Sequence, residues 1–444
     1  MKILEKLSLQ YKYFIGLITF IAILYLRSPE LLKYGRYFAE EGSIFWSYSL
    51  RHGYLDTLLF VDIMTGYFSF NTNIQILFTK FLNINLGPLF TTWSSLFIGL
   101  MPSLFFFKLN ENILEEKVLL LQSFILLTLP SLNFLEVFAN SINSKTYLGV
   151  TTFIILNYGI KNKKYLKIQN LVIFIGFLSS YYSLILLPAF LIKGLYEKNK
   201  NIIPILTSGI IASFVHINIL FFSLSNNLLY EDKFQNKGSL TYIFEVFNGS
   251  VLINLVGEKY FKNEFLSKFS ILAMLIIIYF VIYKKIPFKE YYLIIISFFL
   301  ELILLYFGQI GLEFNQRYAV VISTIFMFLI FHIFNYVKNN LRYITLYFLI
   351  TLVLFTHQQS LYFIECTEFC YYWPDQIEDA QMGLINDYVH WPLGEGEPYW
   401  STSIEYPKVN PSPFQIEILK QEYFLFSEIT LINIIKANLT TLFS

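Results

Sequence analysis

Residues 168–195 read IQNLVIFIGFLSSYYSLILLPAFLIKGL, an apolar run that is long for one membrane-spanning helix and short for two. Lysines distinguish the two alternatives. They precede the run at Lys161, Lys163, Lys164 and Lys167 and recur at Lys193, Lys198 and Lys200. Because cytoplasmic loops of membrane proteins carry an excess of lysine and arginine, both ends of the run are predicted to lie in the cytoplasm. The run is therefore predicted to form two short helices that meet near residues 179–183.

The composition of the whole chain points to the same class of protein. Of its 444 residues, 56% are hydrophobic and only 14% are charged, whereas a soluble domain has roughly 25% charged residues. Soluble, fibrous and disordered classes are excluded because too few charges remain to cover a water-facing surface. The net charge of +1 excludes a nucleic-acid binder, which would show a basic field. The remaining class is an all-α polytopic membrane protein.

Further apolar stretches are long enough to span a membrane. Together with the two short helices they predict about eleven transmembrane helices. The predicted spans are residues 12–26, 86–107, 118–135, 146–160, 202–222, 269–283, 290–307, 318–336 and 341–356.

The positive charges also orient the chain. The lysines beside the first span, those between residues 284 and 289, and the pair Lys338 and Arg342 all fall on one side if the N-terminus is cytoplasmic. The C-terminus is then extracytoplasmic. Arg27 directly follows the first span with no small-residue cleavage site, so this span is predicted to be a retained anchor. Abundant lysine, asparagine, isoleucine and phenylalanine indicate an AT-rich genome and hence a bacterial inner or plasma membrane.

The predicted outer side carries three large segments. The first outer loop covers residues 27–86, in which residues 57–82 are interrupted by polar side chains and are predicted to form interfacial helices that lie on the membrane. A second large outer loop covers residues 223–268. The transmembrane domain, residues 1–356, is followed by an aromatic and proline-rich tail, residues 357–444, whose last stretch is predicted to be a surface-lying or packed helix.

The first outer loop contains the strongest local motif, RYFAEEGSIFW at residues 36–46. Glu40 and Glu41 precede Ser43, which is predicted to cap a helix that begins here. A carboxylate at a helix N-terminus is favoured in its ionised form, which suits a group that accepts a hydrogen bond or binds a metal. Adjacent side chains cannot face one pocket, so at most one of the two is predicted to act. A solvated acidic turn remains the alternative.

Arginine is scarce in this lysine-rich chain, which has only five, and four of them lie on the predicted outer side. This distribution runs against the usual bias. The planar guanidinium suits phosphate or carboxylate groups, which makes Arg36 and Arg317 candidate phosphate ligands. Gln316 accompanies Arg317 at the outer mouth of a predicted span. The alternative for Arg36 is simple contact with lipid headgroups.

Taken together, the N-terminal anchor, the acidic first outer loop, the many short spans and the aromatic outer tail resemble the GT-C class of membrane glycosyltransferases. Residues 129–143 and 178–188 are also similar to recurring segments of bacterial membrane proteins with that architecture. The resemblance implies transfer of a sugar from a polyprenyl-phosphate carrier to a glycan, lipid or protein acceptor. It implies that Glu40 or Glu41 is the catalytic base or a metal ligand and that Arg317 holds the lipid phosphate. The Glu-Glu pair departs from the class, in which aspartate is common here.

Three polar residues in or beside the spans are candidate supporting residues. A charge such as Glu301 is costly inside a span unless it faces a cavity or a partner. His216 is a candidate for that partner, and a hydrogen-bonded packing histidine is the alternative. Asn143 is a candidate contact for the acceptor, with a helix-capping or headgroup role as the alternative. No histidine pair has metal-ligand spacing, and a divalent cation stays open as a cofactor. A transporter or flippase that uses Glu301, and a polysaccharide polymerase or ligase that uses outer arginines without an acidic base, remain alternatives.

Overall fold

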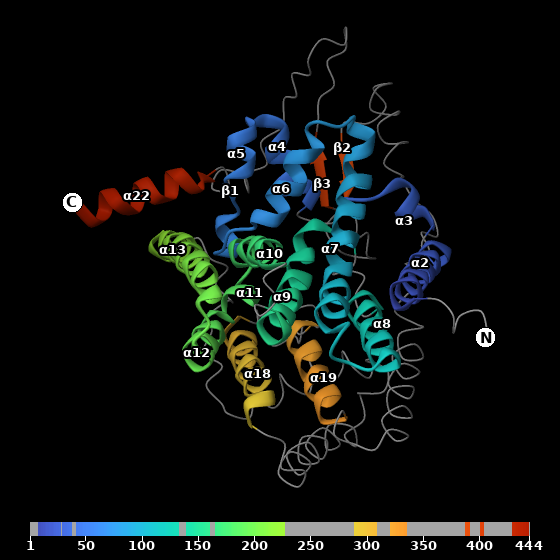
Figure 1. The fold of residues 1–444 in the computed structure, drawn as a ribbon. Coiled ribbons are helices and arrows are strands. Elements are labelled where there is room, and N and C mark those ends of the chain that lie inside the picture. Colours follow the sequence, from blue (N-terminus) through green and yellow to red (C-terminus); the bar gives the residue numbers. More distant parts are fainter. Residues whose placement is uncertain are drawn as a thin grey trace, which may run out of the picture.

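The computed structural model describes ten stretches of the chain and is mostly helical within them (Figure 1). The described residues are 8–27, 29–37, 41–132, 139–159, 165–226, 288–308, 320–334, 387–390, 400–403 and 429–443. The predicted spans 269–283 and 341–356, and nearly all of the second outer loop, lie outside these residues.

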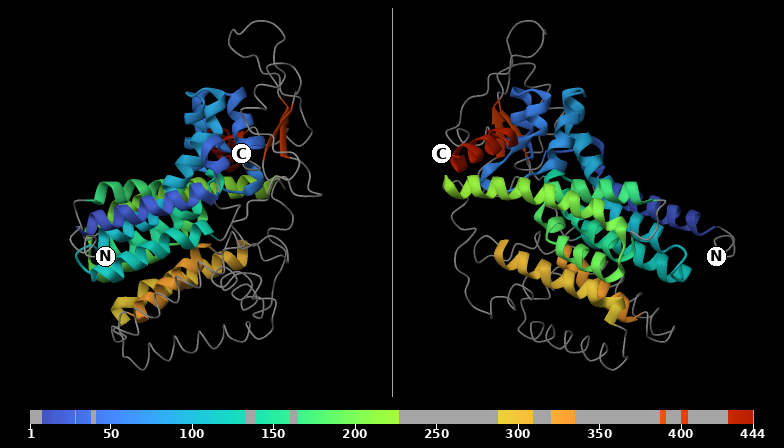
Figure 2. Two further views of the ribbon diagram at one scale, coloured as in Figure 1. Left: turned by 90° about the vertical axis from the view of Figure 1, so that its right-hand side faces the viewer. Right: turned by 60° about the vertical axis from the view of Figure 1, so that its left-hand side comes forward.

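The chain begins with a long helix and then a series of short elements. Helices α4, α5 and α6 form a small lobe above the helix bundle in Figure 1 and in both views of Figure 2. The elements up to this point are α2 (Leu9–Arg27), α3 (Pro29–Tyr34), the π-helical turn η1 (Glu41–Trp46), α4 (Ser47–Arg51), α5 (Tyr54–Leu58), β1 (Phe60–Val61), η2 (Ile63–Thr65), α6 (Phe70–Thr79) and η3 (Ile84–Leu86).

Longer helices follow and form the bundle. They are α7 (Gly87–Asn110), α8 (Glu116–Leu132), α9 (Ser141–Tyr158), α10 (Leu166–Ser179), α11 (Tyr181–Leu184), α12 (Leu187–Glu197), η5 (Lys200–Ile202), α13 (Ile203–Ser225), α18 (Phe288–Gly308) and α19 (Val320–Phe334). Three helical stretches of the described chain are long and apolar enough to cross a membrane, namely Leu9–Leu26, Ile84–Asn110 and Lys200–Ser225. Shorter apolar stretches lie at Leu166–Ser179, Tyr291–Leu304 and Val320–Ile330. These helices support an integral membrane protein.

Helix α9 is the centre of the bundle. It is buried along almost its whole length and packs against α6, α7, α10, α11, α18 and α19. Small side chains let its neighbours approach closely. At Gly149, an added Cβ would lie 3.0 Å from the Tyr182 Cβ and 3.2 Å from the Val321 Cγ2. Both α11 and α19 therefore pack directly on the backbone of α9.

The apolar run at residues 168–195 is broken where the sequence predicts. Helix α10 ends at Ser179, the short helix α11 follows, and α12 resumes at Leu187. Ser180 has an extended backbone, and its side chain accepts a hydrogen bond from the Tyr182 N–H at the start of α11. The serine pair thus ends one helix and caps the next, which confirms the predicted break in this run.

Helix α6 differs from the expectation for a helix that lies on a membrane surface. Such a helix turns its polar side chains to water, but Asn71, Asn73 and Gln75 are all buried inside the protein. The helix packs against α7, α9 and α10. With ten residues, it is too short to cross a membrane. Its polar side chains instead form hydrogen bonds inside the protein.

Two small sheets tie the C-terminal tail to the rest of the chain. Strand β4 (Ile429–Thr430) pairs antiparallel with β1, so that Phe60 faces Thr430. Strands β2 (Asp387–His390) and β3 (Trp400–Ser403) pair with each other, and β3 lies against η1. Helix α22 (Leu431–Phe443) follows β4 and packs on α13. The final helix therefore packs on the bundle along one face, while most of the predicted tail lies outside the described residues.

The inward orientation of α6 can be tested at Asn73. Its side-chain N–H groups donate to the Leu58 carbonyl at 3.0 Å and to the Phe60 carbonyl at 2.7 Å. Asn73→Ala would leave these acceptors without donors and is expected to lower the free energy of unfolding by roughly 1 to 3 kcal/mol. Chemical unfolding of the purified protein in detergent measures this loss. Asn85→Ala, at an exposed asparagine, is the matched control, and equal effects of the two changes would contradict a buried α6.

Candidate functional site

Four helix ends meet at one end of the bundle. The N-termini of α7 and α9 and the C-terminal parts of α10 and α13 all contact the segment between β1 and α6 or α6 itself. The predicted topology places these four ends on the same side of the membrane. We call the side chains gathered around the α7 and α9 ends the polar cluster. It consists of Arg36, Glu41, Asn71, Thr72, Gln75, Thr92, Ser94, Ser95, Asn140, Ser141, Asn143 and Ser144.

A glycine turn brings Arg36 into the polar cluster. Helix α3 ends at a hydrogen bond of 2.9 Å from the Gly35 N–H to the Leu31 carbonyl. Gly35 has φ +73°, and a Cβ there would overlap the backbone of Pro88 and Leu89 in α7. Only glycine permits both the left-handed conformation and this close approach. The Arg36 N–H then donates to the Thr92 Oγ1 at 3.2 Å, which fixes the start of the motif on α7.

The carboxylate of Glu41 lies on the N-terminus of α9. Glu41 is fully buried, and its Oε1 accepts a hydrogen bond of 3.1 Å from the Ser141 N–H. The Asn140 side chain caps the same helix end by accepting from the Asn143 N–H at 2.8 Å. Unpaired N–H groups and the helix dipole both favour an anion at this position. Asn143, a predicted site residue, thus lies in the same turn of helix as the contact to Glu41.

The helix that carries Glu41 begins earlier than expected. The sequence predicts a cap at Ser43, whereas η1 starts at Glu41 itself and continues into α4. A π-helical turn is rare and occurs frequently at functional sites. Its aromatic residues do not face water, because Phe45 and Trp46 are buried with Tyr37, Tyr48 and Phe60 in one apolar cluster. The alternative of a solvated acidic turn is wrong for Glu41, because its own side chain is fully buried.

Arg36 and Glu41 interact electrostatically inside the protein. Burial lowers the pKa of Arg36 to about 10, although the charge of Glu41 acts to raise it. The guanidinium therefore stays charged at neutral pH. Since the folded-state pKa of Arg36 lies below its usual value, keeping this guanidinium charged inside the protein opposes folding at neutral pH. Contact with exposed lipid headgroups is not its role, because only 7% of Arg36 is exposed.

Side chains from α6 connect the two helix N-termini. Asn71 donates to the Ser144 Oγ at 2.6 Å, and Gln75 donates to the same atom at 3.2 Å. The Gln75 Oε1 accepts from Ser94 at 2.6 Å and from Ser95 at 2.9 Å. One amide thus bridges α9 to α7. This network explains why polar residues interrupt an otherwise apolar segment.

A second buried cation lies one helical turn beyond Ser141. Lys145 is 7% exposed, and its Nζ donates to the Tyr67 hydroxyl and lies 4.2 Å from the centre of the Tyr67 ring. Tyr67 meets Tyr181 edge to face at 5.8 Å. Lys145 was assigned no role in the sequence analysis. Its place directly before the predicted span 146–160 was the available signal, because a charge beside a span is costly unless it has a partner.

His216 is not the partner of Glu301. The His216 Nδ1 accepts from the Phe68 N–H at 3.3 Å, and its Nε2 donates to the Phe177 carbonyl at 2.9 Å. Both ring nitrogens therefore hold the segment before α6 against α10. Glu301 lies buried on α18, and its Oε1 has no hydrogen-bond partner. The expected pairing of His216 with Glu301 is therefore wrong, because both ring nitrogens of His216 bond to backbone groups.

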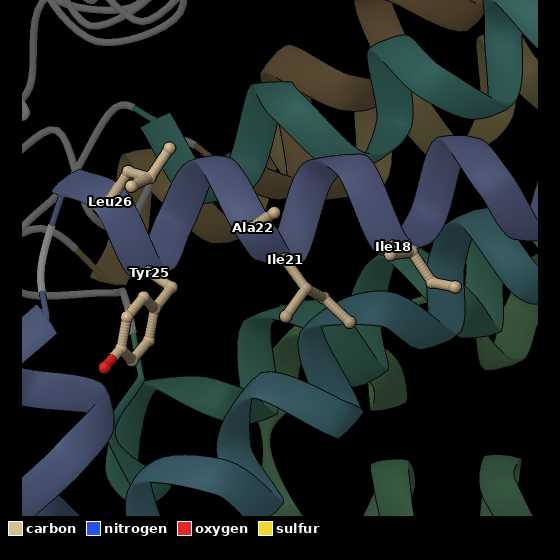
Figure 3. A pocket seen from close by; sticks show the side chains of 5 residues that line it. All are labelled: Ile18, Ile21, Ala22, Tyr25 and Leu26. Carbon is tan, nitrogen blue, oxygen red and sulfur yellow. The ribbon is translucent and has the colours of Figure 1, made fainter.

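The remaining predicted site residues, Glu40, Gln316 and Arg317, lie outside the described residues. Among the residues that the structure describes, no group of acidic, histidine or cysteine side chains could hold a metal ion. Figure 3 shows a separate hollow beside α2, lined by Ile18, Ile21, Ala22, Tyr25 and Leu26. It carries no charged side chain and offers an apolar surface only.

No family model, curated protein or solved structure matches the chain. The chemistry of the polar cluster is therefore the basis for assigning a function.

The coupling of Arg36 and Glu41 can be measured by removing one charge and then both. Glu41→Gln leaves the Arg36 charge buried without its anion and is expected to lower the free energy of unfolding by about 3 to 5 kcal/mol. Adding Arg36→Met removes that charge and should recover most of the loss. Chemical unfolding in detergent measures both changes.

The ion pair of Lys108 and Glu111 at 2.7 Å provides the control, because Glu111→Gln breaks a less buried pair and should cost under about 1 kcal/mol. If the double variant is no more stable than Glu41→Gln alone, Arg36 and Glu41 do not interact as described.

Proposed function

We propose that the protein is a membrane glycosyltransferase that moves a sugar from a polyprenyl-phosphate carrier to a lipid, glycan or protein acceptor. The observation that carries this proposal is the Glu41 carboxylate, held on the α9 N-terminus beside the Arg36 guanidinium at one end of an apolar bundle. A carrier of this kind has an apolar tail, an anionic phosphate and a polar sugar. Its enzyme needs lipid-facing helices, a cation and a carboxylate close together, and this end of the bundle supplies all three.

In the proposed reaction, Glu41 is the general base. It takes the proton of the acceptor hydroxyl while the acceptor oxygen forms a bond to the anomeric carbon of the sugar. The bond from that carbon to the phosphate oxygen breaks, and the polyprenyl phosphate leaves with the electron pair. Positioned base catalysis typically contributes roughly 10² to 10⁴-fold to the rate. The Ser141 N–H keeps Glu41 oriented and favours its ionised form.

The leaving phosphate requires positive charge. Arg36 stays charged at neutral pH, since the pKa of about 10 is well above it, and its planar guanidinium suits a phosphate. The N-terminus of α9 adds a partial positive charge at the same place. Stabilisation of the charge that develops on the leaving group is often the largest single contribution to catalysis. Arg317 remains a further proposed phosphate ligand, with Gln316 beside it.

Access to Glu41 requires a movement of its surroundings, because the carboxylate is fully buried in this structure. The backbone of β3 lies against η1, the turn that Glu41 begins. Figure 1 shows the β2–β3 pair beside the lobe. We therefore propose that the β2–β3 pair covers the donor site and that its displacement admits the acceptor.

The detailed topology is part of the same proposal. It has about eleven spans, a cytoplasmic N-terminus and an extracytoplasmic C-terminus in a bacterial inner or plasma membrane. The meeting of the α7, α9, α10 and α13 ends supports it, because this topology puts those ends on one side. The polar cluster then lies at the extracytoplasmic face, where a carrier lipid presents its sugar.

A transporter or flippase is the second candidate. The observation in its favour is Glu301, a buried carboxyl on α18 whose Oε1 has no hydrogen-bond partner. Ser297, one turn earlier on the same helix, is also buried with an unpartnered hydroxyl. Intramembrane carboxyl groups often mark a substrate or proton pathway. A polymerase or ligase that relies on arginine differs from both in needing neither Glu41 nor Glu301.

The candidates are separated by three glutamine variants and one lysine variant, all produced in cells that lack the native gene. Glu41→Gln is expected to reduce the new surface glycan or glycolipid by roughly 10² to 10⁴-fold, since the general base is lost. Glu116→Gln, at a side chain that is 45% exposed, is the control and should match the native protein. Quantitative mass spectrometry of the envelope glycans provides the measurement.

Normal glycan with Glu41→Gln at normal protein level would overturn the transferase assignment. Loss with Glu301→Gln alone would favour a transporter, whereas loss with Arg36→Lys but with neither glutamine change would favour an arginine-dependent polymerase or ligase.

A further inference from the structure

Helix α22 presents three distinct faces. The pattern follows the 3.6-residue period of an α-helix. One face is buried in the protein, the next is exposed and apolar, and the third is exposed and polar. The buried face consists of Leu431, Ile434 and Asn438, the exposed apolar face of Ile432 and Leu439 with half-buried Ile435 at its edge, and the polar face of Asn433, Lys436 and Thr440.

The direction of α22 differs from that of the bundle. In the left view of Figure 2 the bundle helices run lengthwise across the picture. Helix α22 extends sideways in Figure 1. In the left view of Figure 2, which is turned by 90° about the vertical axis, it is seen nearly end-on. It therefore lies across the spans, as a helix parallel to the membrane plane would.

The contact of α22 with α13 indicates how deep α22 lies in the bilayer. The Asn438 side chain donates to the Asn218 backbone carbonyl at 2.9 Å and lies 3.1 Å from the Asn218 Oδ1. Asn218 precedes the end of α13 by seven residues, which is about 10 Å along the helix. A span of 26 residues is about 39 Å long and exceeds a hydrocarbon core of about 30 Å by a few ångström at each end. The contact then lies roughly 5 Å inside the hydrocarbon boundary, and interfacial helices insert about 5 to 10 Å.

The neighbouring surface of α13 is of the kind that contacts lipid. Ile210, Phe214, Ile217 and Phe221 form an exposed apolar stripe along this span. Helix α22 crosses beside that stripe, and its own apolar face adds to it. Lys436 is its one charged residue, and a long lysine side chain can reach the headgroups from such a position.

We propose that α22 is an interfacial helix whose apolar face is bound by the lipid bilayer. Its partner is the boundary between headgroups and acyl chains at the end of the bundle that holds the polar cluster. The face formed by Ile432 and Leu439 enters the acyl region, and the face formed by Asn433 and Thr440 meets water. This holds whether or not the protein transfers sugars.

Lipid contact at α22 would also stabilise η1, the turn that begins at Glu41. The Leu431 N–H at the start of α22 donates to the Leu59 carbonyl at 2.9 Å, next to the β1–β4 pairing. Phe60 of β1 stacks on Tyr48 at 4.1 Å and meets Phe45 edge to face at 5.3 Å. Phe45 belongs to η1, which begins at Glu41. The membrane surface is thereby linked to the polar cluster through a short series of direct contacts.

Spin labels on the full chain test the proposal. Single cysteines are introduced as Ile432→Cys, Leu439→Cys, Asn433→Cys and Thr440→Cys after Cys366→Ser and Cys370→Ser, and the protein is reconstituted in phosphatidylethanolamine and phosphatidylglycerol vesicles. Power saturation then compares collisions with oxygen, which concentrates in acyl chains, and with a water-soluble nickel chelate. Labels at 432 and 439 should favour oxygen several-fold, as at Ile217→Cys, and labels at 433 and 440 should favour nickel, as at Asn112→Cys.

Two results would overturn the proposal. Nickel access at 432 and 439 equal to that at 433 and 440 would place the whole helix in water. Little access of either reagent at 432 and 439 would mean that protein, including a second copy, covers this face.

Amide exchange gives an independent readout. Ile432→Asp with Leu439→Asp should speed hydrogen–deuterium exchange of residues 431–443 in vesicles at least tenfold, because charges at the apolar face expel it from the lipid. Asn433→Asp with Thr440→Asp is the matched control and should leave exchange unchanged. Equal effects of the two pairs would contradict lipid contact.

Discussion

Helix ends that are buried in an apolar bundle must satisfy their backbone groups with protein side chains, because no water is at hand. This constraint organises the end of the bundle where α7 and α9 begin. Asn140 and Glu41 accept hydrogen bonds from the first N–H groups of α9. The amides of α6 bridge the same turn to α7. A positive helix terminus then favours the buried carboxylate, and that carboxylate in turn favours the buried guanidinium of Arg36.

The resulting arrangement is costly, and the cost bears on function. Burial of a charged arginine opposes folding, whereas apolar residues of similar size often stabilise a protein as well or better. An apolar turn at residues 36–46 could have packed against Phe60 and Ile76 without any charge. Perturbed charged groups cluster at functional sites because chemistry requires them there. The cost of the Arg36 and Glu41 pair is therefore understandable if an anionic substrate and a proton are handled at this point.

Most of the helices and two of the site residues could be predicted from the sequence, because they depend on local patterns. Apolar length predicts the helices, and the lysines predict the break near residues 179–183. Glu41 and Arg36 stand out by residue type alone. The inward orientation of α6 could not be read, since Asn73 and Gln75 look the same whether they face water or a helix end. The pairing of β1 with β4 joins distant segments, and no local signal marks it. The role of His216 likewise depends on backbone groups that only the fold brings near.

The central claim is that the polar cluster receives the phosphate of a carrier lipid. Photoaffinity labelling of the reconstituted protein with a polyprenyl phosphate that carries a diazirine beside the phosphate tests it most directly. We expect adducts within residues 36–46 and 139–145, and competition by unmodified polyprenyl phosphate. Adducts confined to the lipid-facing surfaces of α2 and α13, with none at the polar cluster, would contradict the account.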